Sequence, residues 1–207
     1  LKYQATYDYR EMHDIFKKRP LRYKLSKTHE KQGEKILKKY NINIKKNFVA
    51  IHARDSSYKR YDGESCRNSN IENFKKSVEW KNKKKYQVFR LGNREMIKCS
   101  FSKKIIDITK IDFKKDKELI DLYLISKCKF LIGSTSGPYV MASAFDKPML
   151  LVDMVPLANV LPCARRGIAM PKLYVNKKTK KIMSFREILD TRSSHLRLDI
   201  QFIKNNI

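Results

Sequence analysis

Short apolar runs alternate with amphipathic stretches along the chain from about residue 47 onward. The apolar runs predict buried β-strands at 47–52, 86–92, 104–108, 129–133, 148–153 and 172–175. Apolar residues at helical spacing, or a cap ahead of them, predict helices at 26–42, 70–80, 116–127, 139–146 and 184–190. Strands that alternate with helices at this spacing predict an α/β fold with a Rossmann-like, doubly wound parallel sheet.

The pattern also divides the chain into three parts. We expect an N-terminal helical or interdomain segment at 1–46, a Rossmann-like domain at 47–190 and a C-terminal tail or helix at 191–207. Ser26 or Thr28 is suited to cap the first helix, and Ser184 with Glu187 has the spacing of a capping box. Because the chain begins with leucine and its strong patterns start late, we expect a fragment of a longer protein.

Composition narrows the function classes. The 207 residues contain 47 Lys plus Arg against 21 Asp plus Glu, a net charge of +26. Such a charge can attract nucleic acid, anionic lipid or phosphorylated ligands. The lysines, however, stand in solvated runs such as 81–85 and 176–181, which favours a compositional bias over a dedicated polyanion surface. Aromatic and basic residues do not interleave as a base-stacking platform requires, so we do not expect nucleic-acid binding.

Cysteine usage and hydropathy bear on the compartment. The four cysteines are widely and irregularly spaced, which predicts neither a zinc site nor a disulfide framework and favours the reducing cytoplasm. Acidic and histidine residues do not cluster at ligand spacing, so we predict no metal and no other cofactor. The sequence has no apolar run of bilayer-spanning length, so we expect any membrane contact to be peripheral.

Two polar segments follow predicted strands, and ligands bind at the carboxyl ends of parallel strands. In the first, LIGSTSGP at 131–138, the hydroxyls of Ser134, Thr135 and Ser136 precede Gly137 and a helix start. Exposed N–H groups and the helix dipole would make this an anion site. The alternative is an ordinary strand–turn–helix junction in which Ser136 is a cap.

The second segment, HARD at 52–55, would lie at the same edge. Arg54 offers a planar fork for phosphate oxygens, and His52 or Asp55 could act as acid or base. The alternative is a structural Arg–Asp pair beside a satisfied histidine. The expected proximity of the anion-binding turn favours a functional site.

Other polar residues are weaker candidates. Arg67 and Asn68 could close the site or belong to a helix cap, and Asp153 could contact a ribose or sugar or be only a turn residue. We expect Arg90 and Arg94 to be solvated.

The order and spacing of several segments resemble a family of bacterial glycosyltransferases linked to surface-carbohydrate synthesis. These segments are FVAIHARDSSY, RNSNIENF, VFRLGN, DLYLISKCKFLIGSTSGP and ASAFDKPMLLVDMVP, and the resemblance covers about residues 19–189. It implies a GT-B enzyme of two Rossmann-like domains, of which this chain is chiefly the C-terminal, nucleotide-sugar-binding half. The H-x-R element is also similar to one in GT-B fucosyltransferases, in which the arginine contacts the donor diphosphate, and that role falls on Arg54.

The resemblance implies sugar transfer from a nucleoside-diphosphate sugar to a glycan or lipid-linked acceptor, in the cytoplasm or at the inner face of the membrane. The expected diphosphate ligands are Arg54, Ser134, Thr135, Ser136 and Gly137. Arg67, Asn68 and Asp153 are further donor-binding candidates, and His52 and Asp55 are the candidate catalytic residues. In the fucosyltransferases the aspartate stands farther from the arginine, so the role of Asp55 stays open. Two alternatives also stay open: a nucleotide-sugar epimerase on the same scaffold and a non-enzymatic, basic nucleic-acid-binding module.

Overall fold

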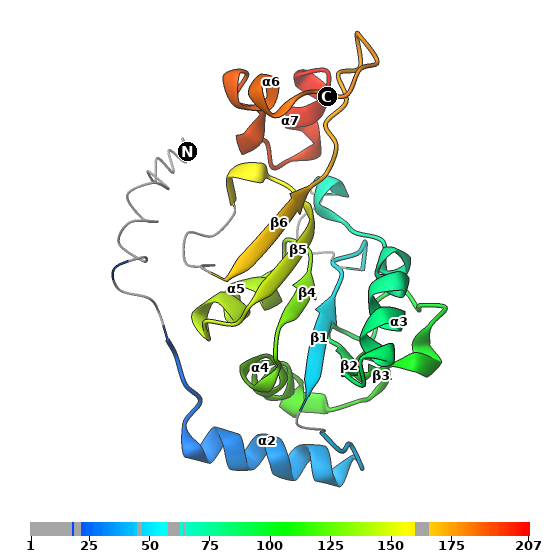
Figure 1. Cartoon of the computed structure of the whole chain (residues 1–207), viewed down its shortest axis with the longest axis vertical. Helices are drawn as coiled ribbons and strands as arrows, with labels where there is room; N and C mark the ends of the chain where they lie inside the picture. Colours follow the sequence, from blue (N-terminus) through cyan, green and yellow to red (C-terminus); the bar gives the residue numbers. More distant parts are fainter. Residues whose placement is uncertain (1–17, 19–21, 45–46, 58–62, 64, 160–165) are drawn as a thin grey trace.

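A computed structural model describes residues 18, 22–44, 47–57, 63, 65–159 and 166–207. They contain a six-stranded sheet in the order β3-β2-β1-β4-β5-β6, in which every neighbouring pair is parallel (Figure 1). The strands are β1 Phe48–His52, β2 Gln87–Arg90, β3 Ile106–Asp107, β4 Leu131–Gly133, β5 Met149–Met154 and β6 Gly167–Pro171. The order and direction confirm the predicted Rossmann-like sheet.

Six α-helices accompany the sheet within the described residues from 22 onward. They are α2 Lys27–Lys39, α3 Lys75–Lys83, α4 Lys117–Lys127, α5 Gly137–Ala144, α6 Phe185–Asp190 and α7 Asp199–Lys204. Short 3₁₀ turns include η1 Ser65–Arg67, η2 Ile71–Phe74, η3 Ser102–Lys104, η4 Ile108–Lys110, η5 Lys114–Asp116, η6 Leu157–Asn159 and η7 Ser193–His195. The predicted caps are confirmed, because Ser26 accepts a hydrogen bond at the start of α2 and Ser184 with Glu187 forms a capping box at α6.

Side chains of β1 alternate between two cores, as the period of two of a strand requires. Phe48 and Ala50 pack on the face covered by α2, α4 and α5, whereas Val49 and Ile51 pack on the face covered by α3. Fully burying a side chain as large as those of Phe48, Val49 and Ile51 contributes about 1.5–3 kcal/mol. Burial on both faces explains why this strand reads as a continuous apolar run.

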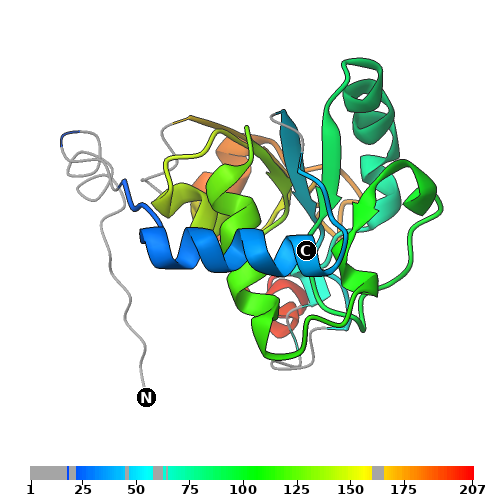
Figure 2. The ribbon, with the colours of Figure 1, turned by 90° about the horizontal axis from the view of Figure 1, so that it is seen from below.

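The helix α2 lies across the end of the molecule at which the strands begin (Figure 2). Its Gly33 faces Tyr123 of α4, and a Cβ at that glycine would come within 2.5 Å of the tyrosine ring. Glycine therefore allows α2 and α4 to pack closely. The opposite end, toward which the strands run, carries α6 and α7 (Figure 1).

The chain reverses its direction of winding between β1 and β4. Strands β2 and β3 extend the sheet on one side of β1, and the chain then crosses to β4 on the other side. His52 and Gly133, the last residues of these two strands, are partners in the register. The two polar segments that follow them therefore start side by side, at the strand switch where such sheets bind ligands.

The prediction of a strand at 172–175 is wrong, because the sixth strand occupies Gly167–Pro171 instead. Val175 makes only an isolated antiparallel bridge to Ile182. An edge strand buries little, and Ile168 is 70% exposed, so its sequence lacks the apolar run of a central strand. Pro171 is the last residue of this edge strand, and a missing backbone N–H group is tolerated at such a position.

Candidate functional site

The turns after β1 and β4 are joined by hydrogen bonds. The backbone N–H of Arg54 donates to Ser134 Oγ at 2.9 Å, and the N–H of Ser134 donates to the carbonyl of His52 at 3.2 Å. His52, Arg54 and Asp55 are only 5–6% exposed, although all three are ionisable. The structure thus brings together the two segments in which the sequence predicted a site.

His52 contacts the second turn through Ser136. Ser136 Oγ lies 3.0 Å from His52 Nδ1 and donates to the carbonyl of Ser134 at 3.1 Å. Burial lowers the pKa of His52 to about 4, with Arg90 and Lys117 acting in the same direction and Asp55 opposing them. The imidazole is therefore neutral at physiological pH and can accept a proton or exchange hydrogen bonds with a hydroxyl.

The turn after β4 leads into the amino-terminal end of α5. Ser136 stands at the cap position with extended backbone, but its side chain makes no capping hydrogen bond. The first N–H groups of a helix lack partners within it and carry partial positive charge. Apart from its chain neighbours and its own helix, no atom of the described residues lies within 4 Å of the position that a Cβ on Gly137 would occupy, which leaves room for a ligand to approach the backbone there.

The other two hydroxyls of this turn are directed inward. Thr135 is 1% exposed, and its Oγ1 donates to the carbonyl of Val155 at 2.9 Å. Ser134 is fully buried and accepts from the Arg54 N–H. Within this turn, Ser136 and the backbone at Gly137 are therefore better placed to meet an anion than the hydroxyls of Ser134 and Thr135.

A loop at residues 65–70 forms one wall of the site and is anchored to Arg54. The guanidinium Nη1 of Arg54 donates to Asn68 Oδ1 at 3.0 Å, and the N–H of Ser69 donates to the Arg54 carbonyl at 2.7 Å. Arg67 reaches the turn after β4, since its Nη2 donates to the Thr135 carbonyl at 3.4 Å. The helix cap in this segment is Asn70, which accepts from the N–H of Glu72, and not Asn68.

Two further contacts hold this loop against the end of β5. The hydroxyl of Ser69 donates to the carboxylate of Asp153, and Lys172 Nζ donates to the carbonyl of Asn68. Asp153 has a positive φ of 53°, at an irregularity in the pairing of β5 with β6. The structure thus places Asp153 beside the loop that carries Arg67 and Asn68.

The C-terminal helix α7 also anchors this loop, which the sequence did not indicate. The carboxylate of Asp199 accepts from the N–H of Ser65 at 2.9 Å, from its hydroxyl at 2.6 Å and from the N–H of Cys66 at 2.7 Å. Partial burial alone would raise the pKa of Asp199, but these donors hold it below its ordinary value. The contact joins residues 134 positions apart, so no local pattern could have revealed it.

Asp55 is held by donors on both of its carboxylate oxygens. Oδ1 accepts from the N–H and the hydroxyl of Ser57, and Oδ2 accepts from the N–H of Ile97 at 2.8 Å. A cavity of about 430 Å³ lies beside it, lined by Asp55, Ser56, Asn68, Ser69, Asn70, Ile71 and Ile97. Four of these seven residues carry a neutral hydroxyl or amide group, which suits a hydroxyl-rich ligand.

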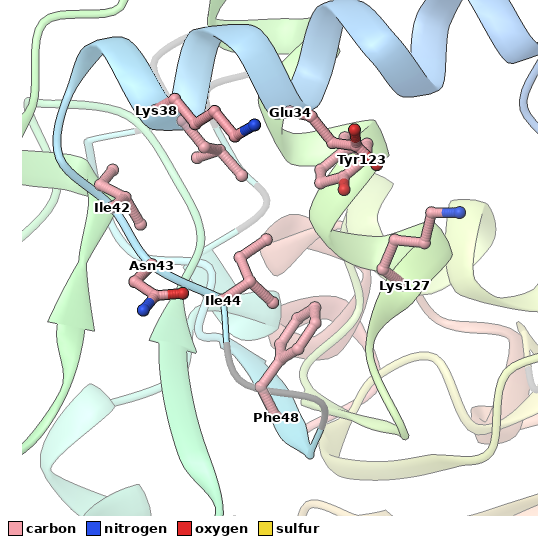
Figure 3. A pocket seen from close by; sticks show the side chains of 9 residues that line it. Glu34, Lys38, Ile42, Asn43, Ile44, Phe48, Tyr123 and Lys127 are labelled. Atoms are coloured by element: carbon pink, nitrogen blue, oxygen red, sulfur yellow. The ribbon is translucent and has the colours of Figure 1, made fainter.

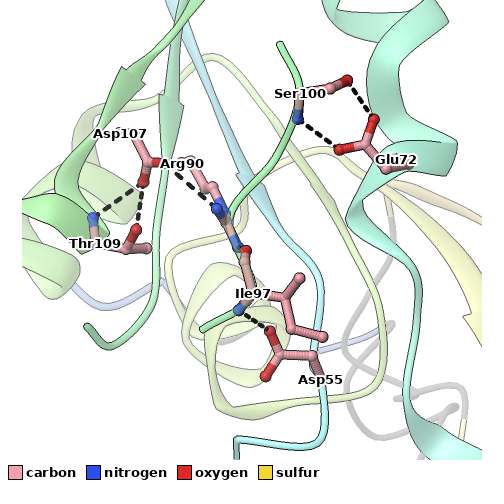
Figure 4. A network of polar contacts seen from close by, with 7 residues as sticks. All are labelled: Asp55, Glu72, Arg90, Ile97, Ser100, Asp107 and Thr109. Carbon is pink, nitrogen blue, oxygen red and sulfur yellow. Dashed lines mark hydrogen bonds and ion pairs between the residues drawn. The ribbon is translucent and has the colours of Figure 1, made fainter. Parts of the chain in front are cut away.

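Arg90 belongs to a buried network next to Asp55, so the prediction that it is solvated is wrong (Figure 4). It is 1% exposed; its Nη1 pairs with Asp107 Oδ2 at 3.3 Å, and its Nη2 donates to the Ile97 carbonyl at 2.6 Å. Asp107 in turn accepts from the N–H and hydroxyl of Thr109. Because Ile97 also donates to Asp55, the network connects the ends of β1, β2 and β3.

Arg94 is solvated as predicted. Its side chain is 62% exposed and lies 3.3 Å from Asp112 in a surface ion pair.

Another cavity, of about 490 Å³, lies at the opposite end of the sheet, between α2, α4 and the start of β1 (Figure 3). Its walls include Ile42, Ile44 and Phe48, with Lys38 and Lys127 at the rim. It contains none of the residues that the sequence singled out. The candidate site therefore lies at the strand switch and not in this cavity.

Within the described residues, no group of three His, Cys, Asp or Glu side chains is arranged to hold a metal ion. None of the helices found among those residues is both long enough and apolar enough to cross a bilayer.

Comparisons with known proteins bear on the fold. No family model and no curated protein sequence matches this chain. Among solved structures it is similar to ADP-heptose LPS heptosyltransferase II from E. coli, with a TM-score of 0.52 and 10% identity over 72% of this chain and 44% of that one. It is also similar to a glycosyl transferase family 9 protein from Veillonella parvula, with a TM-score of 0.51 and 14% identity over 90% of this chain and 52% of that one. The chain thus spans about half the length of these glycosyltransferases, and the likeness is one of fold.

Proposed function

We propose that this chain is the donor-binding part of a glycosyltransferase that transfers a sugar from a nucleoside-diphosphate sugar to a glycan or lipid-linked acceptor in cell-surface polysaccharide synthesis. In this proposal the chain is the C-terminal half of a GT-B enzyme that works in the cytoplasm or at the inner face of the membrane. The observation that carries the proposal is that the segment containing Arg54 is hydrogen-bonded to the turn that leads into α5, at the switch between β1 and β4. The fold shared with the E. coli heptosyltransferase supports it.

In the proposed reaction the acceptor oxygen bonds to the anomeric carbon as the bond from that carbon to the diphosphate oxygen breaks. The electron pair leaves with the nucleoside diphosphate, so negative charge grows there in the transition state. Arg54 and the N–H groups around Ser136 and Gly137 would stabilise that charge more strongly than the ground state, without requiring a metal. Arg67, Asn68 and Asp153 would contact the donor from the loop and from β5.

The proton of the acceptor hydroxyl needs a base. His52 is the better candidate within this chain, because both oxygens of Asp55 already accept hydrogen bonds from Ser57 and Ile97. Asp55 would then position the turn that carries Arg54. The Ser136 hydroxyl beside His52 would orient the imidazole.

Ligand binding tests the donor site directly. We expect uridine, guanosine or adenosine diphosphate to raise the thermal midpoint of the chain, with one base preferred. Arg54→Ala should weaken that binding about 10- to 150-fold, because hydrogen bonds to a charged group contribute roughly 1.5–3 kcal/mol. Arg94→Ala is the matched control, since it removes a solvated arginine from the loop that follows β2.

Equal affinity in Arg54→Ala and the wild type would refute the assignment of Arg54. A shift with single-stranded oligonucleotides but with no nucleoside diphosphate would favour a nucleic-acid-binding module instead. For the full-length enzyme, product analysis separates the remaining alternative: a transferase moves the sugar to an added glycan, whereas an epimerase converts the donor alone.

A further inference from the structure

A strongly basic groove lies at the end of the molecule opposite the candidate donor site. It has a volume of about 740 Å³ and runs between residues 22–27, the end of α4 and the turns before β5 and β6. Its lining contains six cationic side chains, Arg22, Lys24, Lys27, Lys127, Lys147 and Arg166. Only two acidic residues, Glu30 and Asp146, line it with them.

The acidic residues of the groove already have cationic partners. Asp146 lies 3.5 Å from Arg22 Nε, and Glu30 lies 2.6 Å from Lys127 Nζ. Within the described part of the chain, no carboxylate lies within ion-pair distance of Lys24, Lys27, Lys147 or Arg166. The groove therefore keeps a net positive charge that its own side chains do not neutralise.

Lys147 is the most informative member of this group, because it is partly buried whereas the other five cations are exposed. Burial lowers the pKa of its ammonium group, and the neighbouring cations Lys127, Lys129 and Arg166 lower it further, against an opposing effect of Cys128. A partly buried charge among like charges is unfavourable unless an anion accompanies it. The arrangement therefore favours a multiply charged anion.

The groove is also a built feature and not a loose cluster of surface lysines. The N–H of Tyr23 donates to the carbonyl of Ala144 at 3.0 Å, which fixes residues 22–25 against the end of α5. The Lys127–Glu30 pair joins α4 to α2 across the groove. Leu25 and Phe145 add apolar surface to the lining, which suits an organic group attached to the anion.

We propose that this groove is a second binding site, for a phosphate-bearing ligand, separate from the donor site. Lys147 and Arg166 would bind the phosphate oxygens, with Lys24 and Lys27 at the entrance. Lys147 lies just before β5 and Asp153 near its end, so strand length alone separates the two sites by about 20 Å. The proposal does not depend on the sugar-transfer reaction.

A local probe avoids confusion with pyrophosphate bound at the strand switch. Lysines of the wild-type chain are ¹³C-dimethylated, and inorganic pyrophosphate is added at about 0.15 M salt, where long-range attraction is screened. The signals of Lys147 and Lys178 are identified by their absence from the spectra of the variants Lys147→Met and Lys178→Met. Lys178, in the lysine-rich turn at 176–181, is the control for general attraction to this basic protein.

We expect the Lys147 signal to shift and saturate at a pyrophosphate concentration at least about tenfold lower than any shift of the Lys178 signal. Lys147→Met should also raise the thermal midpoint, since it removes an unfavourable charge. An unmoved Lys147 signal, or two signals that move together, would overturn the proposal.

A vesicle assay identifies the source of the phosphate. Wild type, Lys147→Met and Lys178→Met are floated with vesicles containing about 30 mol% anionic phospholipid. If pyrophosphate gives the expected result, the vesicle assay has two outcomes. Flotation of the wild type and of Lys178→Met, but not of Lys147→Met, supports the site and assigns it to a lipid headgroup. Flotation absent in the wild type, or unchanged in Lys147→Met, supports the site and assigns it to a soluble phosphate ester.

Discussion

The contact between Asp199 and the loop at 65–70 gives a sharp test of how the candidate donor site is held. Asp199→Asn keeps the size of the side chain but removes the charge and one of its two acceptor oxygens. The carboxylate accepts three hydrogen bonds from Ser65 and Cys66, and an amide can accept from only part of this set. Because Asp199 is partly exposed, each lost hydrogen bond should contribute an amount near the lower end of its usual range. We therefore expect the free energy of unfolding to fall by about 1–3 kcal/mol in total.

The loop carries Arg67 and Asn68, so a donor would have to restore its order on binding. We therefore expect Asp199→Asn to weaken nucleoside-diphosphate binding by about 5- to 150-fold, measured by isothermal titration calorimetry. The thermal midpoint should fall by about 2–12 °C, because each kcal/mol corresponds to roughly 2–4 °C in a domain of this size. Asp190→Asn, at an exposed residue that ends α6, is the matched control.

The sign of the pH dependence separates the hydrogen bonds from a general charge effect. The pKa of Asp199 is lowered in the folded state, so its stabilisation is present above the ordinary carboxyl pKa and is lost as pH falls through the lowered value. The stabilities of wild type and Asp199→Asn should therefore converge in acid. Equal donor affinity in wild type and Asp199→Asn, or an equal loss in Asp190→Asn, would refute the reasoning.

Two further predictions concern the buried polar groups. Arg90→Met should lower the free energy of unfolding in urea by about 3–5 kcal/mol, because it leaves the Asp107 carboxylate buried without its cation; a loss below about 1 kcal/mol would contradict the buried network. For His52, the folded pKa of about 4 lies below the unfolded value, so protonation of the unfolded chain should destabilise the protein as pH falls below 6.5. The loss should reach about 3 kcal/mol near pH 4, measured in urea as the difference between wild type and His52→Asn, and parallel profiles for the two proteins would exclude it.

The sequence was sufficient to place the candidate site because ligands of parallel sheets bind at the carboxyl ends of the strands, and these ends can be predicted from the apolar runs. Once 47–52 and 129–133 are recognised as strands of one sheet, the polar residues after them must reach the same edge. The rest depended on contacts without a local pattern. Asp199 contacts residues that lie 134 positions before it, and β6 is an edge strand whose exposed Ile168 and Met170 give no buried run.

Arg54 and Arg90 show where prediction from residue type stops. Both follow apolar residues at the ends of neighbouring buried strands, and both are buried in the structure. Arg90 is opposite Asp107 in the register of β2 and β3, so its charge is paired within the sheet. Arg54 instead reaches out of the sheet to the amide oxygen of Asn68, on the loop that walls the site. The register of β2 against β3 thus gives Arg90 a carboxylate partner within the scaffold, whereas the contact with Asn68 ties Arg54 to the wall of the candidate site.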